Sequence, residues 1–183
     1  MNDIDQLSTQ LFEEAKRFLE KASEPSQDST AFIAFTHAAL LLGFSSLEAH
    51  LNAVAEELLM RPGLSVLDRS VLSECEFGLI DGRFQTKKGL KMYRLDDRIT
   101  HILANFSTSV TPVPTADSWW GNLRNGIALR NQLVHPKKGL EIKIDAVSAA
   151  LNAILGCLDT LYQQVYSRPF PVRNRGLNST LAF

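Results

Sequence analysis

The sequence predicts an all-α fold, an up-and-down bundle of about five helices that forms one domain over residues 1–166, followed by a tail over residues 167–183. Apolar residues make up 45% of the 183 residues, enough to build the core of a single domain. Long segments repeat their apolar residues at steps of three and four, which is the spacing of one helix face. Clusters rich in Ser and Pro, such as "SEPSQDS" and "STSVTPVPTADS", separate these segments.

The N-terminal half is expected to hold two long helices and a short one. The first covers about residues 4–22, where Leu7, Leu11 and Phe18 recur at helical spacing. The second covers about residues 29–60 and is apolar on two faces, which is typical of a central helix in a bundle. The "RPG" that follows ends it, and a short third helix is expected at about residues 64–76.

Residues 77–92 leave two alternatives open. The "DG" within them is flanked by apolar residues, which fits a small hairpin, but the segment fits a loop equally well. A helix is expected at about residues 93–107. After a loop with two prolines, another is expected at about 118–134, with Asp117 or Ser118 as its N-cap.

The last helix is expected at about residues 145–166, with Asp145 as its candidate N-cap. Its apolar residues alternate steps of three and four without interruption: Ile144, Val147, Leu151, Ile154, Leu158, Leu161 and Val165. We interpret this stripe as the part of the helix that faces the core of its own chain. A dimer interface is the alternative, because a coiled coil needs the same spacing.

Composition narrows the class of protein. The formal net charge is −1, so the chain as a whole does not attract nucleic acid, and any such contact needs a local basic patch. Cys75 and Cys157 lie far apart and read as packing residues of a reducing compartment. The acidic N-terminus does not resemble a signal peptide, and "AFIAFTHAALLLGF" is too short to predict a membrane span. We therefore expect a soluble cytoplasmic protein without a membrane partner.

Arg130 occupies an unexpected place in "LRNGIALRNQLVHPKK". On a helical wheel of about 100° per residue it falls inside an apolar arc, formed by Trp119, Trp120, Leu123, Ile127, Leu129, Leu133 and Val134. A cation in such an arc is costly unless it is paired or opens onto a cavity or an interface. His135 precedes Pro136, so the helix should end near Val134 with His135 at its lip.

"LRNQLVHP" resembles the R-x(4–6)-H motif of the HEPN domain superfamily, here "RNQLVH" over residues 130–135. The pattern "SSLEAHLNAVAEELL" in the second helix and the order of the helices resemble that superfamily too, over about residues 30–165. The resemblance implies a HEPN-like helical domain over residues 1–166 that acts as a metal-independent endoribonuclease, such as a toxin or a defence effector. It also implies a homodimer in which both copies of the motif face one cleft.

By this resemblance, Arg130 and His135 are the catalytic pair and Asn131 is the polar residue that accompanies them. The chemistry fits these residue types. Cleavage of RNA by its own 2′-hydroxyl needs a group that moves protons near neutral pH, and histidine is suited to this. It also needs a permanent cation where negative charge grows on phosphorus, which arginine supplies. Glu48 of the second helix is the carboxylate expected to orient Arg130.

The same region carries a modest basic patch that could bind RNA. Residues 117–143 hold three more basic than acidic residues, and Arg124, Lys137 and Lys138 are the candidate RNA-binding side chains. The four histidines form no H-x-x-x-H or H-E-x-x-H pattern, so no metal site and no cofactor are expected. The resemblance suggests an antitoxin or a nucleotidyltransferase as partner. However, Lys137 stands where toxins silenced by nucleotide addition often carry a Tyr.

Other interpretations of these residues remain open. Arg130 fits an ion pair with Glu48 or Glu56 that serves only the fold, and His135 fits a helix end where it meets free carbonyl groups. The chain would then be a catalytically silent HEPN-like module that binds RNA, a nucleotide or a protein partner, or else a purely structural helical dimer. Trp119 and Trp120 are expected to pack in the core or at an interface rather than to stack on bases.

Overall fold

The computed structural model describes residues 3–25, 28–108 and 117–183 of the chain. Within these residues it is mostly helical, with six α-helices, one hairpin of two strands and a short 3-10 helix. The elements in chain order are α1 (Asp3–Ala22), α2 (Ser29–Leu59), α3 (Val66–Ser73), β1 (Cys75–Ile80), β2 (Arg83–Leu90), α4 (Leu95–Phe106), α5 (Trp120–Val134), α6 (Ile144–Tyr166) and η2 (Arg173–Arg175). The helical class predicted from the sequence is thus right, although the hairpin means that the fold is not purely α.

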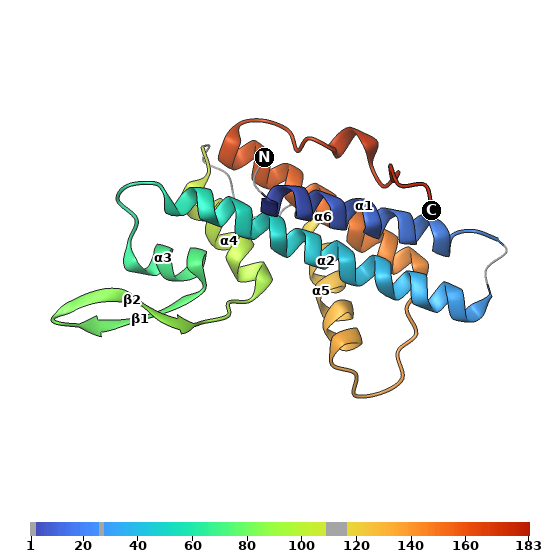
Figure 1. Cartoon of the computed structure of the whole chain (residues 1–183), viewed down its shortest axis with the longest axis horizontal. Coiled ribbons are helices and arrows are strands. Elements are labelled where there is room, and N and C mark those ends of the chain that lie inside the picture. Colours follow the sequence, from blue (N-terminus) through green and yellow to red (C-terminus); the bar gives the residue numbers. More distant parts are fainter. Residues whose placement is uncertain (1–2, 26–27, 109–116) are drawn as a thin grey trace.

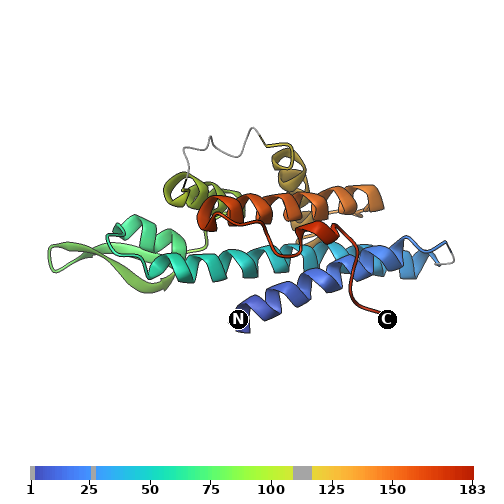
Figure 2. The same cartoon turned by 90° about the horizontal axis from the view of Figure 1, so that it is seen from above.

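The central helix is α2, which runs along the whole bundle in Figure 1. Asp28 caps its N-terminus by accepting a hydrogen bond from the backbone N–H of Ala31 at 2.8 Å. Figure 2 shows α1 on one side of α2 and α6, and α4 and α5 on the other. Gly43 allows α2 and α6 to approach closely, because a Cβ built there would lie 2.2 Å from the Leu151 side chain.

The regular stripe of α6 lies in the core of its own chain. Val147, Leu151, Ile154, Leu158 and Leu161 are completely buried against the neighbouring helices. This confirms the interpretation as a core stripe, of which only Ile144 at the start of the helix is half-buried. Cys157 lies on the same helix and is also buried, as expected for a packing residue.

The uncertain segment around residue 80 forms an antiparallel hairpin. Asp81 and Gly82 make its turn, with φ angles of 48° and 76°. Positive φ at both central residues is the geometry of a type I′ turn, for which "DG" is a favoured sequence. Of the two alternatives for residues 77–92, the hairpin is therefore correct and the loop is not.

Two predicted helix caps are wrong. Neither Asp117 nor Ser118 caps α5, because the cap residue is Trp119 and only the backbone carbonyl of Asp117 accepts from Trp120. The helix begins there because both tryptophan rings are buried in the core. Asp145 lies inside the first turn of α6, whose cap is Lys143, and there its carboxylate is favourable near the positive end of the helix.

The tail over residues 167–183 folds back onto α1 (Figure 1). Phe170 is buried and its ring lies 5.2 Å from that of His50. Glu13 of α1 accepts hydrogen bonds from Lys16, Arg175 and both the backbone N–H and the hydroxyl of Thr180. Burial raises the pKa of Glu13, but the hydrogen bonds from Lys16 and Thr180 outweigh it and hold the pKa below its ordinary value.

Two helices are long and apolar enough to cross a membrane, α2 with a mean hydropathy of 1.6 and α6 with 1.4. For α2 this differs from the sequence-based expectation, because the apolar run of the helix is longer than "AFIAFTHAALLLGF" alone. About 39% and 50% of their most apolar windows are buried inside the protein. Core helices of soluble proteins pass the same test, so this finding is weak evidence for a membrane span.

Candidate functional site

Helix α5 is docked to the bundle at its start and projects from it at its end (Figure 1). Trp120, Leu123 and Gly126 are buried, whereas Val134 is 45% exposed. Gly126 marks the close crossing, because a Cβ there would lie 2.8 Å from the Cβ of Ala150 and 2.9 Å from the ring of Phe44. The helix therefore presents its last two turns, which carry the "RNQLVH" motif, beyond the main core.

Arg130 lies at the edge of the core, held by two oxygen atoms. Its Nη2 donates to Oε1 of Glu48 at 2.8 Å, and its Nη1 donates to Oδ1 of Asn131 at 3.2 Å. The side chains of Arg130 and Glu48 remain 30% and 39% exposed, so the pair is open to solvent. The expected partner carboxylate is thus the one that the structure shows. Arg130 is only half-buried because this part of the apolar arc is half-covered, so the cation is both paired and open to a cleft.

Arg130 keeps donors to spare. A guanidinium has five N–H groups, and the hydrogen bonds found within the described residues use one on each of two nitrogen atoms. The remaining donors are available to a phosphate, which arginine binds in a planar, two-pronged geometry. Glu48 fixes the direction of the guanidinium without consuming its capacity to bind.

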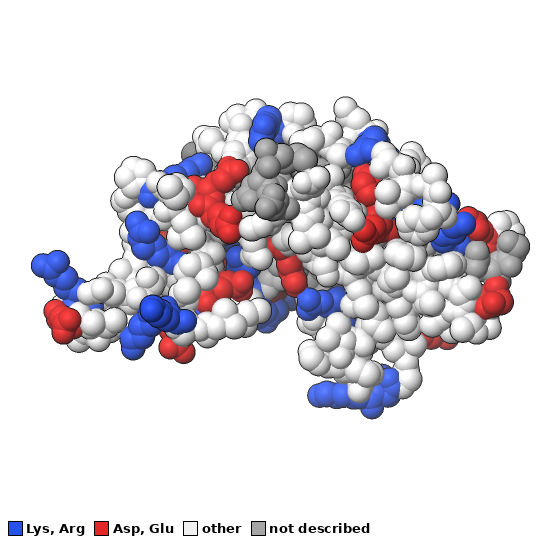
Figure 3. Space-filling model, in the orientation of Figure 1, with Lys and Arg blue, Asp and Glu red and all other residues white. Residues whose placement is uncertain are grey.

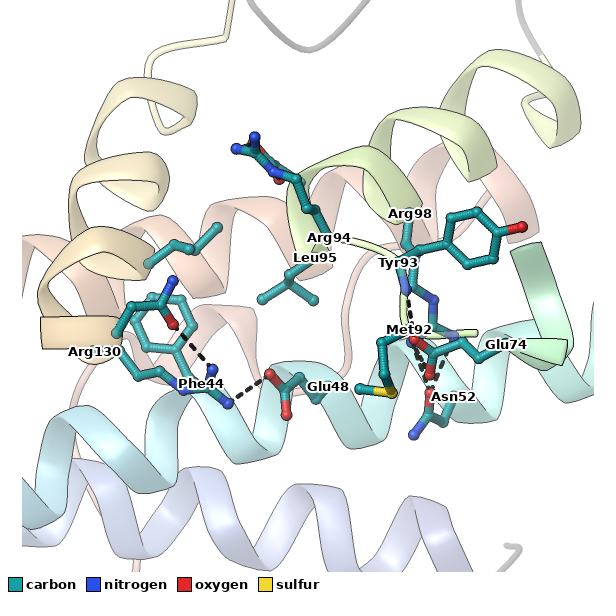
Figure 4. Close-up of a pocket in the computed structure, with 13 residues that line it drawn as sticks. Phe44, Glu48, Asn52, Glu74, Met92, Tyr93, Arg94, Leu95, Arg98 and Arg130 are labelled. Carbon is teal, nitrogen blue, oxygen red and sulfur yellow. Dashed lines mark hydrogen bonds and ion pairs between the residues drawn. The ribbon is translucent and has the colours of Figure 1, made fainter. Parts of the chain in front are cut away.

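A cleft of about 430 Å³ opens beside Arg130, and Figure 4 shows its lining. It contains three arginines, Arg94, Arg98 and Arg130, and each of them is paired with an acid of the same cleft. The pairs are Arg94 with Asp96 at 2.9 Å, Arg98 with Glu74 at 3.0 Å and Arg130 with Glu48 at 2.8 Å. The cleft is therefore rich in charge but close to neutral.

Arg98 is the most deeply buried cation of this cleft, with 4% of its surface exposed. Both of its Nη atoms donate to Oδ1 of Asn52 at 3.1 Å, while its Nε has no hydrogen-bond partner in the described part of the chain. Burial lowers the pKa of Arg98, and the carboxylates of Glu74 and Glu48 act against that shift. This network ties the start of α4 to the middle of α2 and so shapes one wall of the cleft.

His135 follows the last residue of α5 and is exposed. Its backbone N–H donates to the carbonyl of Asn131 at 2.9 Å, which closes the helix. Its side chain lines a different hollow from that of Arg130, together with Lys137 and Lys138. Asn131 is the residue that lines both hollows. Within one protomer, the expected catalytic pair therefore flanks Asn131 without sharing a cleft.

The remaining predicted site residues lie around these two hollows. Arg124 and Asn131 line a third hollow next to the cleft, together with Arg94. Lys137 and Lys138 are exposed in the turn between α5 and α6, at the foot of the projecting helix, where Figure 3 shows a cluster of basic side chains. Trp119 donates from Nε1 to Thr160 at 3.0 Å and is buried, so it packs as expected and is closed to bases.

Sequence reasoning missed several residues of the cleft, namely Asn52, Glu74, Arg94, Asp96 and Arg98. Most of them follow or precede the hairpin, in "MYRLDDR" and at the end of α3. The charge of "RLDDR" was a usable signal, but the segment before it had no assigned structure. No three His, Cys, Asp or Glu side chains of the described residues are grouped so that they could hold a metal ion.

Comparisons with known proteins add no relative. No protein-family model, no curated protein and no solved structure matches this chain.

Proposed function

We propose that this chain is a metal-independent endoribonuclease of HEPN type that cleaves RNA at a site completed by a second protomer. One observation carries the proposal: Arg130 is oriented by Glu48 and Asn131 yet keeps free donors at a solvent-open cleft, five residues before an exposed His135. A fixed cation and a nearby imidazole are the two groups that this reaction needs.

The chemistry assigns a role to each side chain. The His135 ring removes the proton from a ribose 2′-hydroxyl, and the 2′-oxygen attacks the adjacent phosphorus. The bond from phosphorus to the 5′-oxygen breaks, and that oxygen takes a proton, so the products are a 2′,3′-cyclic phosphate and a 5′-hydroxyl. Arg130 stabilises the negative charge that builds on the phosphoryl oxygens in between. Asn131 lies between the two groups, and Arg124, Lys137 and Lys138 bind flanking phosphates.

A homodimer accounts for the separation of Arg130 and His135 within one protomer. The end of α5 exposes apolar surface at Val134, next to the half-buried Ile127, Leu129 and Leu133. Packing two such helix ends together would bury this surface and bring His135 of one protomer toward Arg130 of the other. The HEPN resemblance of "RNQLVH" implies the same arrangement.

The biological setting belongs to the same proposal. The resemblance favours a cytoplasmic toxin or defence effector, which would need an antitoxin or another silencing partner. Lys137 stands at the position where a silencing Tyr is expected, so we propose a partner that blocks the cleft over one that adds a nucleotide to this chain.

A catalytically silent module is the second candidate, and one observation favours it. Each arginine of the cleft already has an acidic partner in its own chain, so the cleft is close to neutral and a polyanion must compete with Glu48 for Arg130. Such a domain would bind RNA, a nucleotide or a protein without cutting it.

The test is incubation of the purified protein with mixed RNAs in EDTA. Wild type should release fragments that end in 2′,3′-cyclic phosphate, and His135→Ala and Arg130→Ala should each lose about 10²- to 10⁴-fold in rate. His37→Ala and Arg61→Ala are the matched controls, because they remove the same residue types outside the cleft, and they should cleave like wild type. Intact RNA that still binds the protein would favour the silent module, and equal cleavage by all variants would assign the activity to a contaminant.

A further inference from the structure

The β1–β2 hairpin projects from the end of the bundle, and most of its surface is exposed (Figures 1 and 2). It is a sheet of only two strands, so each strand leaves one edge unpaired. Isolated hairpins are marginally stable in water, and this one is attached to the bundle through α3 and the residues that lead into α4. Because an arm of this kind contributes little to the core, we expect its side chains to serve a role other than stability.

One face of the hairpin is apolar and aromatic. Leu79 lies directly opposite Phe84, and Phe77 lies opposite Thr86, so these four side chains share a face. Leu79 and Phe84 are 64% and 63% exposed. Leaving two large apolar side chains side by side in water is costly, and such a patch marks a contact surface.

Lys88 alternates onto this face and Lys91 packs against its Phe77 ring, whereas Arg83 and Lys87 lie on the opposite face, where the Lys87 side chain covers Gly78. The hairpin and the residue after it carry Arg83, Lys87, Lys88 and Lys91 against Glu76 and Asp81. Nζ of Lys91 lies 4.8 Å from the centre of the Phe77 ring and 4.9 Å from that of Tyr93. In Figure 3 basic side chains are prominent on the projecting hairpin. Cations interleaved with aromatic rings suit a single-stranded nucleic acid, whose bases stack while its phosphates are neutralised.

The same charges argue against strand addition by a second copy of the chain. β2 contains "RFQTKK", and lysines along an edge strand oppose the approach of another identical strand. A second hairpin would also bring its own excess of positive charge. A polyanion fits the charge of this surface, whereas a second copy does not.

The hairpin leads directly into the cleft beside Arg130. Lys91 follows β2, and the next three residues, Met92, Tyr93 and Arg94, all line that cleft. Met92 is 72% exposed at its rim (Figure 4). The segment that joins the hairpin to α4 therefore forms part of the lining of the cleft that holds Arg130.

We propose that the β1–β2 hairpin is a binding arm for single-stranded RNA, on which Phe84 and its neighbours stack bases while Lys88 and Lys91 contact phosphates. The arm holds the strand so that a downstream phosphate reaches Arg130. This inference rests on the proposed function for the identity of the ligand. It adds a region of the chain that the "RNQLVH" motif does not include.

The test measures binding separately from cleavage. The full chain carrying His135→Ala is titrated against a fluorescein-labelled single-stranded RNA of about 12 nucleotides, a length within the usual range of such sites. Adding Phe84→Ala should raise the Kd by roughly 5- to 100-fold, the loss expected for one stacked base. Adding Lys88→Glu should lower the slope of log Kd against log salt by about 0.7 or more, as for at least one lost phosphate contact.

Matched controls lie at the opposite end of the bundle. Ile33→Ala removes a similarly exposed apolar side chain from α2, and Lys21→Glu reverses a charge on α1, and neither should change the Kd. Circular dichroism checks that every variant keeps the helical content of wild type. Duplex RNA of the same sequence should bind the arm more weakly, because its bases are already stacked.

The outcomes separate this inference from the proposed function. RNA cleavage that survives Phe84→Ala and Lys88→Glu in the wild-type background, with Kd and salt slope unchanged in the His135→Ala background, overturns the arm and leaves the nuclease intact. Loss of RNA binding in both variants supports the arm even if wild type cuts no RNA. A Phe84→Ala variant that changes the sedimentation coefficient but not the Kd would make the hairpin a contact between protein chains and overturn the proposal.

Discussion

Helices α5 and α6 are neighbours in sequence and both carry apolar stripes, yet they use them differently. In α6 nearly the whole stripe is buried, from Val147 to Val165. In α5 only the first two turns hold fully buried residues, the later Ile127, Leu129 and Leu133 are half-buried against the core, and Val134 is exposed. Apolar spacing thus shows which face of a helix is buried, but not how far along the helix the burial extends. The part of α5 that the core leaves uncovered also carries Arg130 and precedes His135.

The largest expected effect tests how tightly α6 is packed, and it is the difference in reactivity of Cys157 between the folded and the unfolded protein. Burial raises the pKa of the Cys157 thiol, with Asp117 adding to the shift, so the reactive thiolate is scarce in the folded protein. In a Cys75→Ser background at about pH 8, labelling by a disulfide reagent should be slower than in urea by roughly three orders of magnitude or more. Rapid labelling of the folded protein would show that α6 is less securely packed than its stripe indicates.

Shortening one leucine of the apolar stripe in each helix tests the difference in burial between α6 and the end of α5. Leu151 of α6 is completely buried, and Leu151→Ala should lower the free energy of unfolding by about 2–5 kcal/mol. Leu133 of α5 is half-buried, and Leu133→Ala should cost no more than about 1 kcal/mol in the monomer. Urea denaturation at low protein concentration measures both values. Equal losses would mean that the end of α5 belongs to the core.

Gly126 separates the docked part of α5 from the projecting part. Gly126→Ala places a methyl group within 2.9 Å of both Ala150 and the Phe44 ring, so the helix must shift. We expect the free energy of unfolding to fall by about 1–3 kcal/mol, although alanine normally stabilises a helix relative to glycine. Gly121→Ala, which meets no atom within 4 Å, is the control and should be neutral or stabilising. Thermal unfolding followed by circular dichroism compares the two.

The smallest expected effect on stability is that of Glu48→Gln. The pair with Arg130 is partly exposed, so its loss should cost about 1 kcal/mol or less. Glutamine keeps a hydrogen-bond acceptor but removes the charge that orients the guanidinium. RNA cleavage should therefore fall by roughly tenfold or more while the Tm stays nearly constant. A large loss of Tm with unchanged cleavage would assign the pair to the fold alone.

The sequence predicted the helical segments well where burial follows a simple period. The stripes of α2 and α6 identified the two central helices, and "RPG" marked the end of α2. Helix starts were predicted less well. Asp117, Ser118 and Asp145 are favourable cap residues by type, but the starts of α5 and α6 are set by buried side chains such as Trp120 and Val147.

The candidate site, too, was predicted only in part from the sequence. The pairing of Arg130 with Glu48 was predicted, because a cation in an apolar arc needs a carboxylate from the facing helix. The separate hollows of Arg130 and His135 were not, since they depend on the angle at which α5 leaves the bundle. Arg94 and Arg98 were missed because the hairpin brings them to the cleft, and local periodicity does not report such long-range placement.

The tail described above has a consequence for the order in which the chain completes its structure during synthesis. The buried Lys16 and Glu13 of α1 need Asn178 and Thr180 as partners, and these leave the ribosome more than 150 residues later. Until then α1 can lie against α2 only with part of its polar network unsatisfied. Of the helices in the described part of the chain, α1 is made before the others but is among the last to be secured, and chaperones have a long interval in which to reach it.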